Sequence, residues 1–352
     1  MPTLVAVLGS GPIGIDTALS LTRKGYNVIV IEKGPSIASN IERWKNVTLF
    51  SPNALNFSRT GIEVFKELNQ PIPNPESFFT GGQFIDGYLR PLESYLLQCG
   101  KCTFMYNTEV VCVGKRGVSK GNMGKSKRTA AKFNILISAK SKDDNSESYL
   151  QCDAVIDATG TYDNPNYVGA GGLPAVCEAK LQSEKSKLIS YYVANPDEIF
   201  PGTRAGAGAR AGLEAGVGAG AVVAVIGSGT SAITSLKRLL SAKKASGDSG
   251  RACKTIFWIT RCTEGTLPFP NNPDDPLPQR KELFQFANAL AQSAADTDNA
   301  AAAALDDSGI SRVAYQCGVE VTKILEVTQP DGSIKLQLTL SKRDDDDASE
   351  HT

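Results

Sequence analysis

The sequence predicts an α/β fold, because two glycine-rich turns each lie between a short apolar run and an amphipathic helix. The first turn, Gly9-Ser10-Gly11-Pro12-Ile13-Gly14, follows the run Leu4–Leu8, and the second, Gly227-Ser228-Gly229-Thr230-Ser231-Ala232, follows Val222–Ile226. At such strand-to-helix turns glycines let the backbone approach a pyrophosphate, and the free N–H groups of the helix attract its negative charge. The two turns predict two bound dinucleotides.

The residues after the first turn complete its expected setting. Ala18 falls on the helix face that packs on the sheet, Gly25 ends the helix, and residues 28–31 form the next strand. Glu32 follows this strand, 18 residues after Gly14. A carboxylate at about this spacing binds the ribose hydroxyls of the adenosine half. We therefore expect the first dinucleotide to contact Gly9, Gly11, Pro12, Ile13, Gly14 and Glu32.

The second turn differs in the residue that ends its next strand. The strand Thr255-Ile256-Phe257-Trp258-Ile259-Thr260 ends in Arg261, where an NAD site would carry an acid. Arginine can pair with a 2′-phosphate, which Asp or Glu would repel, so the sequence favours NADP. The alternative is a solvated charge at a strand end, because residues 242–251 make the spacing loose. The expected contacts of the second dinucleotide are Gly227, Gly229, Thr230, Ser231, Ala232 and Arg261.

The order of these motifs resembles the flavoproteins with two dinucleotide-binding domains, the class that holds thioredoxin reductase and the flavin-containing monooxygenases. Besides both turns, the resemblance rests on Asp153-Ala154-Val155-Ile156-Asp157-Ala158-Thr159-Gly160 and on Trp258-Ile259-Thr260-Arg261. It implies two Rossmann-like, three-layer ββα domains, the second inserted into the first. It also implies FAD at the first turn, with Thr159 and Gly160 beside it, and NAD(P)H at the second.

Composition and low-complexity segments suggest the domain boundaries. A chain of 352 residues with 41% hydrophobic residues is long enough for two domains. The Gly- and Ala-rich residues 203–221 have the composition of a flexible linker. We expect a FAD-binding domain at 1–202, this linker, an NAD(P)-binding domain at 222–340 and an acidic tail at 341–352. The basic residues 115–132 are expected to form a solvated hairpin tip.

The resemblance implies an enzyme, an NADPH-dependent FAD oxidoreductase that passes hydride from nicotinamide to flavin and on to an acceptor. The acceptor stays open, with O2 and monooxygenation of a small molecule as one option. A disulfide reductase is the alternative, because Cys99-Gly100-Lys101-Cys102 has the spacing of a redox pair, although it lies within the FAD domain. A catalytically weak, truncated dinucleotide-binding protein is a third. His351 is the sole histidine, so no catalytic triad and no metal site are expected, and the catalytic residues are unknown.

Charge and hydropathy indicate the kind of partner. The chain has 37 basic and 37 acidic residues, which argues against nucleic acid or a membrane surface and favours a small-molecule substrate. The first strand opens near residue 3, and no apolar run approaches the roughly 18 residues of a membrane span. A cytoplasmic protein is therefore expected.

Two further segments bear on the flavin site. Ser51 and Asn53 either hydrogen-bond flavin or substrate, or belong to a structured loop that caps a helix. The class returns to its FAD domain after the nicotinamide domain and supplies a Gly-Asp there. Residues 322–340 instead predict a hairpin that turns at Pro330-Asp331-Gly332, directly before the acidic tail. The sequence therefore predicts that this return is lacking.

Overall fold

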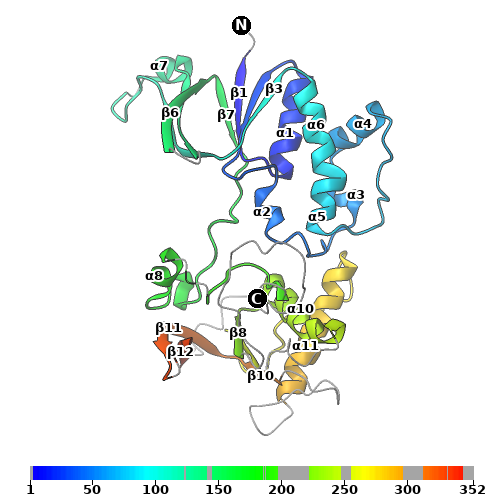
Figure 1. Ribbon diagram of the computed structural model, residues 1–352, viewed down its shortest axis with the longest axis vertical. Coiled ribbons are helices and arrows are strands. Elements are labelled where there is room, and N and C mark those ends of the chain that lie inside the picture. Colours follow the sequence, from blue (N-terminus) through cyan, green and yellow to red (C-terminus); the bar gives the residue numbers. More distant parts are fainter. Residues whose placement is uncertain are drawn as a thin grey trace. The chain divides into compact units, whose positions relative to one another are not determined.

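The structure is a computed structural model, and its parallel sheets confirm the predicted α/β class. It divides into two compact units, Met1–Asn164 and Pro165–Thr352 (Figure 1). The residues that it describes are 3–122, 124–140, 145–184, 186, 188–196, 222–246, 255–295, 312–330 and 332–343. Within them, no helix is long and apolar enough to cross a membrane.

The first unit is built on a parallel sheet with the strand order β3-β2-β1-β7. Leu8 pairs in register with both Ile31 and Asp157, and Ile31 pairs with Met105. The carboxyl ends of all four strands therefore meet at one edge, where open parallel sheets bind their ligands. The strands are β1 (Leu4–Leu8), β2 (Asn27–Ile31), β3 (Cys102–Met105) and β7 (Ala154–Asp157).

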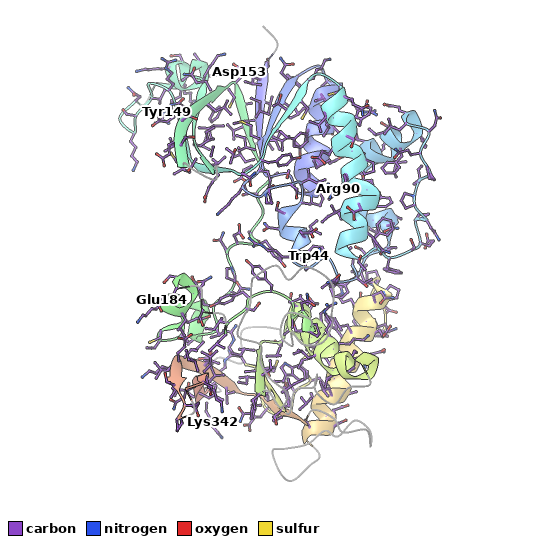
Figure 2. All side chains as sticks on the ribbon, in the orientation of Figure 1. Trp44, Arg90, Tyr149, Asp153, Glu184 and Lys342 are labelled. Atoms are coloured by element: carbon purple, nitrogen blue, oxygen red, sulfur yellow. The ribbon has the colours of Figure 1, made fainter. Side chains whose placement is uncertain are left out.

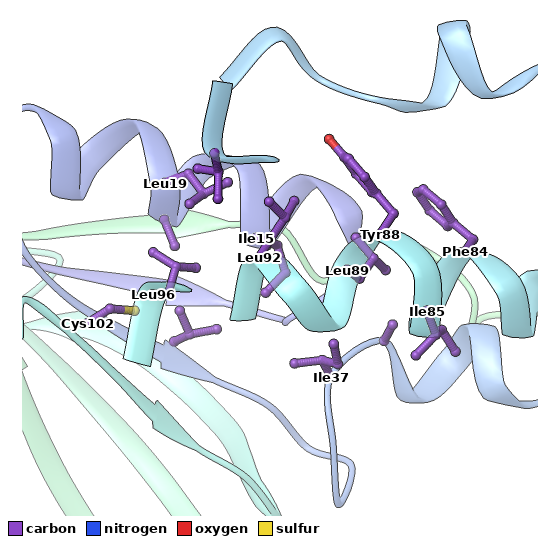
Figure 3. Packing of buried hydrophobic residues seen from close by; sticks show 14 of the residues in the cluster. Ile15, Leu19, Ile37, Phe84, Ile85, Tyr88, Leu89, Leu92, Leu96 and Cys102 are labelled. Atoms are coloured by element: carbon purple, nitrogen blue, oxygen red, sulfur yellow. The ribbon is translucent and has the colours of Figure 1, made fainter. Parts of the chain in front are cut away.

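Helices cover one face of this sheet because their apolar residues recur at helical spacing. Ile15 and Leu19 of α1 share a cluster with Leu92 and Leu96 of α6 (Figure 3), and all four side chains are fully buried. The helices of this unit are α1 (Pro12–Arg23), α2 (Ser39–Glu42), α3 (Asn53–Asn56), α4 (Arg59–Glu67), α5 (Gly81–Phe84), the π-helical turn η1 (Ile85–Leu89), α6 (Arg90–Gln98) and α7 (Lys125–Ala130).

An antiparallel meander covers the other face (Figure 1), which gives the predicted three layers. Ile135 and Ile137 of β5 pack with Ala6 and Leu8 of β1. Asp153, labelled in Figure 2, accepts a hydrogen bond from Leu4 N (2.9 Å) and fixes the return of the meander to the sheet. The strands β4 and β5 pair antiparallel, and α7 lies in the connection between them, so the hairpin predicted around residues 115–132 is confirmed. The strands of the meander are β4 (Thr108–Lys115), β5 (Phe133–Lys140) and β6 (Asn145–Cys152).

The second unit contains a smaller parallel sheet with the order β10-β9-β8. The hairpin predicted near the end of the chain is confirmed, although it begins earlier, at Val319. The elements are β8 (Val222–Ile226), α10 (Thr230–Ser246), β9 (Thr255–Ile259), α11 (Pro278–Ala295), β10 (Arg312–Gln316), β11 (Val319–Thr328) and β12 (Ile334–Lys342).

The two units divide after Asn164, earlier than the boundary expected at 202. The segment after Asn164, with η2 (Ala170–Gly172) and α8 (Glu178–Ser183), packs on the β11–β12 hairpin. Val176 bridges to Lys323, and Val176 N donates to Thr322 O (2.9 Å). Gly and Ala composition marks the later linker, but the apolar contacts of α8 decide which unit the segment joins.

Three sequence expectations are not settled by the fold. The linker at 203–221 and the end of the acidic tail from 344 lie outside the described residues. All strands of the first sheet precede Asn164 among the described residues, so the predicted insertion of the second domain into the first is not confirmed.

Candidate functional site

The outer glycines of the first turn are required by the fold itself. Gly9 has φ +91°, and a Cβ there would lie 2.8 Å from Ala158 O. A Cβ on Gly14 would lie 2.0 Å from Gly9 O, which no side chain can tolerate. These glycines therefore let α1 start close against the strand ends.

The middle glycine is not required by packing or by backbone conformation. Gly11 is the N-cap of α1 with φ −69° and ψ −177°, an extended conformation open to any residue. A Cβ there would meet no atom within 4 Å. Space at this position, beside the unpaired N–H groups that begin α1, is what a pyrophosphate needs to approach the backbone. The turn therefore fits a dinucleotide.

Glu32 lies directly after β2 and ties the turn to the neighbouring strand. Its Oε2 accepts hydrogen bonds from Ser10 N (2.9 Å) and Ser10 Oγ (2.7 Å), and its Oε1 accepts one from Gly34 N (2.8 Å). A carboxylate offers about four acceptor sites, so Oε1 retains capacity for one further donor such as a ribose hydroxyl. The role of Ser10, which is fully buried, was not predicted from the sequence.

The Ala-Thr-Gly segment lies against the same turn. Ala158 N donates to Leu8 O (2.9 Å), and the Thr159 Cα would lie 3.1 Å from a Cβ on Gly9. Asp157 Oδ1 accepts hydrogen bonds from Thr159 N and Thr159 Oγ1, and these bonds lower the pKa of the Asp157 carboxyl. Gly160 turns the chain away with φ +66°. The structure thus brings together the predicted Gly9, Gly11, Pro12, Ile13, Gly14, Glu32, Thr159 and Gly160, whose contact with a cofactor stays a prediction.

The second turn repeats the open middle position. A Cβ on Gly229 would meet nothing within 4 Å, as at Gly11. Gly227 has φ +117°, and its carbonyl accepts a hydrogen bond from Nε1 of the buried Trp258 (3.0 Å). Ala232 stands where the first turn has its third glycine, Gly14. The second turn therefore has room for a methyl group at a position where the first turn has none. Thr230 and Ser231 form the first turn of α10, as predicted.

The two sheets have the same pattern of backbone hydrogen bonds at the carboxyl ends of their strands. In the first unit, Gly9 N donates to Ile31 O and Glu32 N donates to Met105 O. Asn107 N donates to Gly34 O, and Thr108 N donates to Glu32 O. In the second unit and in the same order, Gly227 N donates to Ile259 O and Thr260 N donates to Gln316 O. Gly318 N donates to Cys262 O, and Val319 N donates to Thr260 O. Residue by residue, Thr260 is therefore the counterpart of Glu32, and Arg261 is the counterpart of Lys33.

This register corrects the sequence assignment by one residue. Arg261 was expected at the position of the NAD-type acid, but that position belongs to Thr260. Thr260 is 1% exposed, and its Oγ1 lies 3.1 Å from Tyr315 Oη, so its hydroxyl is already engaged. Arg261 follows it and is exposed. A neutral residue at the acid position removes the charge that would repel a 2′-phosphate, so the corrected register still favours NADP.

The loop with Ser51 and Asn53 takes the structural role among its two alternatives. Ser51 Oγ donates to Asn56 Oδ1 (2.7 Å). Asn53 is fully buried, and its Nδ2 donates to Asn74 O and Ser77 Oγ. Both side chains therefore hold the loop, while the buried Asn53 Oδ1 has no hydrogen-bond partner among the described residues.

The thiols of Cys99 and Cys102 are both reduced and poorly suited to redox catalysis. Burial raises the pKa of the Cys102 thiol to about 12, with a smaller contribution from Cys99. Cys99 ends α6, and its thiol donates to Leu96 O (3.0 Å). Since the thiolate is the reactive form, Cys102 is inert near neutral pH.

Two of the solved structures that share this fold are disulfide reductases. The bacillithiol disulfide reductase of Bacillus cereus matches 98% of this chain over 76% of its own length, with a TM-score of 0.56 and 17% identity. The same enzyme of Staphylococcus aureus matches 96% of this chain over 74% of its own length, with a TM-score of 0.51 and 18% identity. No protein-family model matches the sequence, and no curated protein matches it either. At such identities the likeness confirms the predicted fold.

Proposed function

We propose that this chain is an NADPH-dependent FAD oxidoreductase, with FAD at the first turn and NADPH at the second. The observation that carries the proposal is the shared hydrogen-bond pattern of the two sheets with different residues at one position. The first sheet has Glu32 there, which suits free ribose hydroxyls, and the second has Thr260 followed by Arg261, which suits a 2′-phosphate. The fold shared with two bacillithiol disulfide reductases supports an oxidoreductase.

The protein's own part in the reaction is binding and orientation. When bound, the nicotinamide and the flavin supply the hydride transfer chemistry themselves. Gly11 and Gly229 leave room for each pyrophosphate, and the N-termini of α1 and α10 present unpaired N–H groups to it. Glu32 holds Ser10 and so fixes the shape of the first turn. This division of labour requires no histidine acid or base.

The acceptor in this proposal is a small molecule. A bacillithiol disulfide reductase among the structural neighbours makes a disulfide one option, but the Cys99–Cys102 pair does not support it in this chain. The raised pKa of Cys102 and the hydrogen bond of Cys99 to the end of α6 both disfavour thiol exchange. We therefore assign no role in electron transfer to these thiols.

The FAD assignment is tested with Gly11→Val. Its side chain enters open space in the ligand-free turn, so the variant should fold, but it blocks the approach of the pyrophosphate. We expect FAD affinity, measured by titration of flavin fluorescence, to fall by at least tenfold. Gly121→Val, on the tip of the β4–β5 hairpin where a Cβ has room, is the matched control and should bind FAD as the parent does. Equal FAD affinity in the parent and Gly11→Val would refute the assignment.

A further inference from the structure

The end of the β11–β12 hairpin brings a second arginine to Arg261. Lys342, labelled in Figure 2, pairs in register with Val319 as the last residue of β12. Arg343 follows it, and its N donates to Gly318 O (2.9 Å). Its guanidinium Nη1 then donates to the backbone carbonyl of Arg261 (3.3 Å). The sequence, in which the two residues stand 82 positions apart, does not indicate this contact.

The two arginines lack a counter-charge among the described residues. Within that part of the chain, no carboxylate comes within the 4.0 Å of an ion pair with either side chain. Arg261 is exposed and Arg343 is half-buried. Glu264 is the acid close by, but it lies beside Gly318 and Cys317 instead. The Arg343 guanidinium lies at the Arg261 backbone, so an anion that binds there is attracted by the positive charges of both residues.

The position of Arg261 and Arg343 in the sheet indicates which anion they would bind. Arg261 stands one residue beyond the strand-end position where Glu32 serves the ribose in the first unit. The corresponding residue here, Thr260, is neutral and faces Tyr315. An anion attached to the ribose of the second dinucleotide would therefore meet no carboxylate at Thr260, and it would lie near Arg261 and the Arg343 guanidinium that is hydrogen-bonded to the Arg261 carbonyl. A phosphate has three terminal oxygens and can accept charge-assisted bonds from both.

We propose that Arg343 is a specificity-determining residue that binds the 2′-phosphate of NADPH together with Arg261. This inference rests on the proposed function and extends it to a residue outside the nucleotide-binding motif. One donor of Arg343 holds the carbonyl of Arg261, and the other four N–H groups of its guanidinium are available for the ligand. Arg343 thus positions the backbone at Arg261 and adds a positive charge.

The test compares two nucleotides that differ by one phosphate. Adenosine 2′,5′-bisphosphate and adenosine 5′-monophosphate are titrated into the full chain loaded with FAD, by isothermal titration calorimetry. Arg343→Gln removes the charge but keeps an amide that can donate to Arg261 O, and Arg343→Lys keeps the charge. Lys335→Gln, at the far end of the exposed β12, is the control for net charge.

We expect Arg343→Gln to bind the bisphosphate about tenfold more weakly and the monophosphate unchanged. Arg343→Lys should retain part of the preference, Lys335→Gln all of it, and added salt should weaken the parent's preference. An unchanged monophosphate affinity also shows that the variant is folded. A preference that survives in Arg343→Gln, or an equal loss of both ligands, would overturn the role of Arg343 alone. A parent that does not distinguish the two nucleotides would overturn the NADPH assignment itself.

Discussion

Glu32 and Thr260 occupy the same position in the two sheets of this chain. Each receives a strand-edge hydrogen bond at its carbonyl, from Thr108 N (2.9 Å) and from Val319 N (3.3 Å). Glu32 turns its carboxylate back to Ser10, whereas the Thr260 hydroxyl faces Tyr315. One backbone frame therefore presents a negative charge in the first unit and none in the second, which is the basis for assigning two different dinucleotides.

The nucleotide preference depends on Arg261. Arg261→Ala removes a charge-assisted contact to the 2′-phosphate worth roughly 1.5 to 3 kcal/mol, about ten- to a hundredfold in affinity. NADH affinity should barely change, because NADH lacks this phosphate. Titration of both nucleotides into the parent and the variant measures the difference. Equal losses for NADPH and NADH, or no loss for NADPH, would contradict the role of Arg261.

The glycines of the first turn should separate stability from binding. Gly14→Ala places a Cβ 2.0 Å from Gly9 O, so α1 must shift. We expect the free energy of unfolding without FAD to fall by about 1 to 3 kcal/mol. Gly11→Ala, whose Cβ has open space, should change it by no more than about 1 kcal/mol, the difference in flexibility between Gly and Ala. Urea unfolding of both apo variants checks this, and a larger loss in Gly11→Ala would show that the turn is packed differently.

The indole of Trp258 should stabilise the second turn. Trp258→Phe removes the hydrogen bond to Gly227 O and leaves a partly buried carbonyl without that donor. A loss of about 1 to 3 kcal/mol in stability follows from the unsatisfied group and the lost ring volume. NADPH affinity should fall as well, while FAD affinity, which depends on the other unit, should not. Titration of NADPH and of FAD into the parent and the variant measures both affinities, and an equal loss of FAD affinity would indicate general unfolding.

The thiols should be dispensable for flavin reduction. Cys99→Ser with Cys102→Ser is expected to leave NADPH-driven flavin reduction unchanged, because neither thiol reaches the strand edge at the first turn. Turnover of a disulfide substrate that disappears in the double variant would instead support the reductase alternative.

The Cys102 thiol also has a pH signature. Its pKa is about 12 in the folded chain against 9.0 ordinarily, so the folded state holds the proton more tightly. The stability contributed by this group is therefore complete below about pH 9 and is lost as the pH rises towards 12. Comparison of alkaline unfolding in the parent and Cys102→Ala isolates the effect. A parent and variant with the same alkaline slope would contradict the raised pKa.

The sequence predicted the local parts of this molecule better than the long-range ones. Gly9 to Glu32 could be assigned because turn, helix and strand follow one another directly and their spacing is fixed by the fold. The residue at the acid position of the second sheet was missed by one, because only the register of β8, β9 and β10 shows that Thr260 corresponds to Glu32. Arg343 and the early domain boundary depend on how a distant hairpin packs, and no short motif encodes that.

In the proposed reaction, one chain binds FAD and NADPH and passes hydride between them. It is tested most directly by loading the purified chain with FAD, removing oxygen, and following the flavin absorbance by stopped flow after mixing with NADPH or NADH. We predict that NADPH bleaches the flavin and that NADH requires at least tenfold higher concentrations to reach the same rate. A chain that retains no FAD, or a bound flavin that neither nucleotide reduces, would contradict the proposed function.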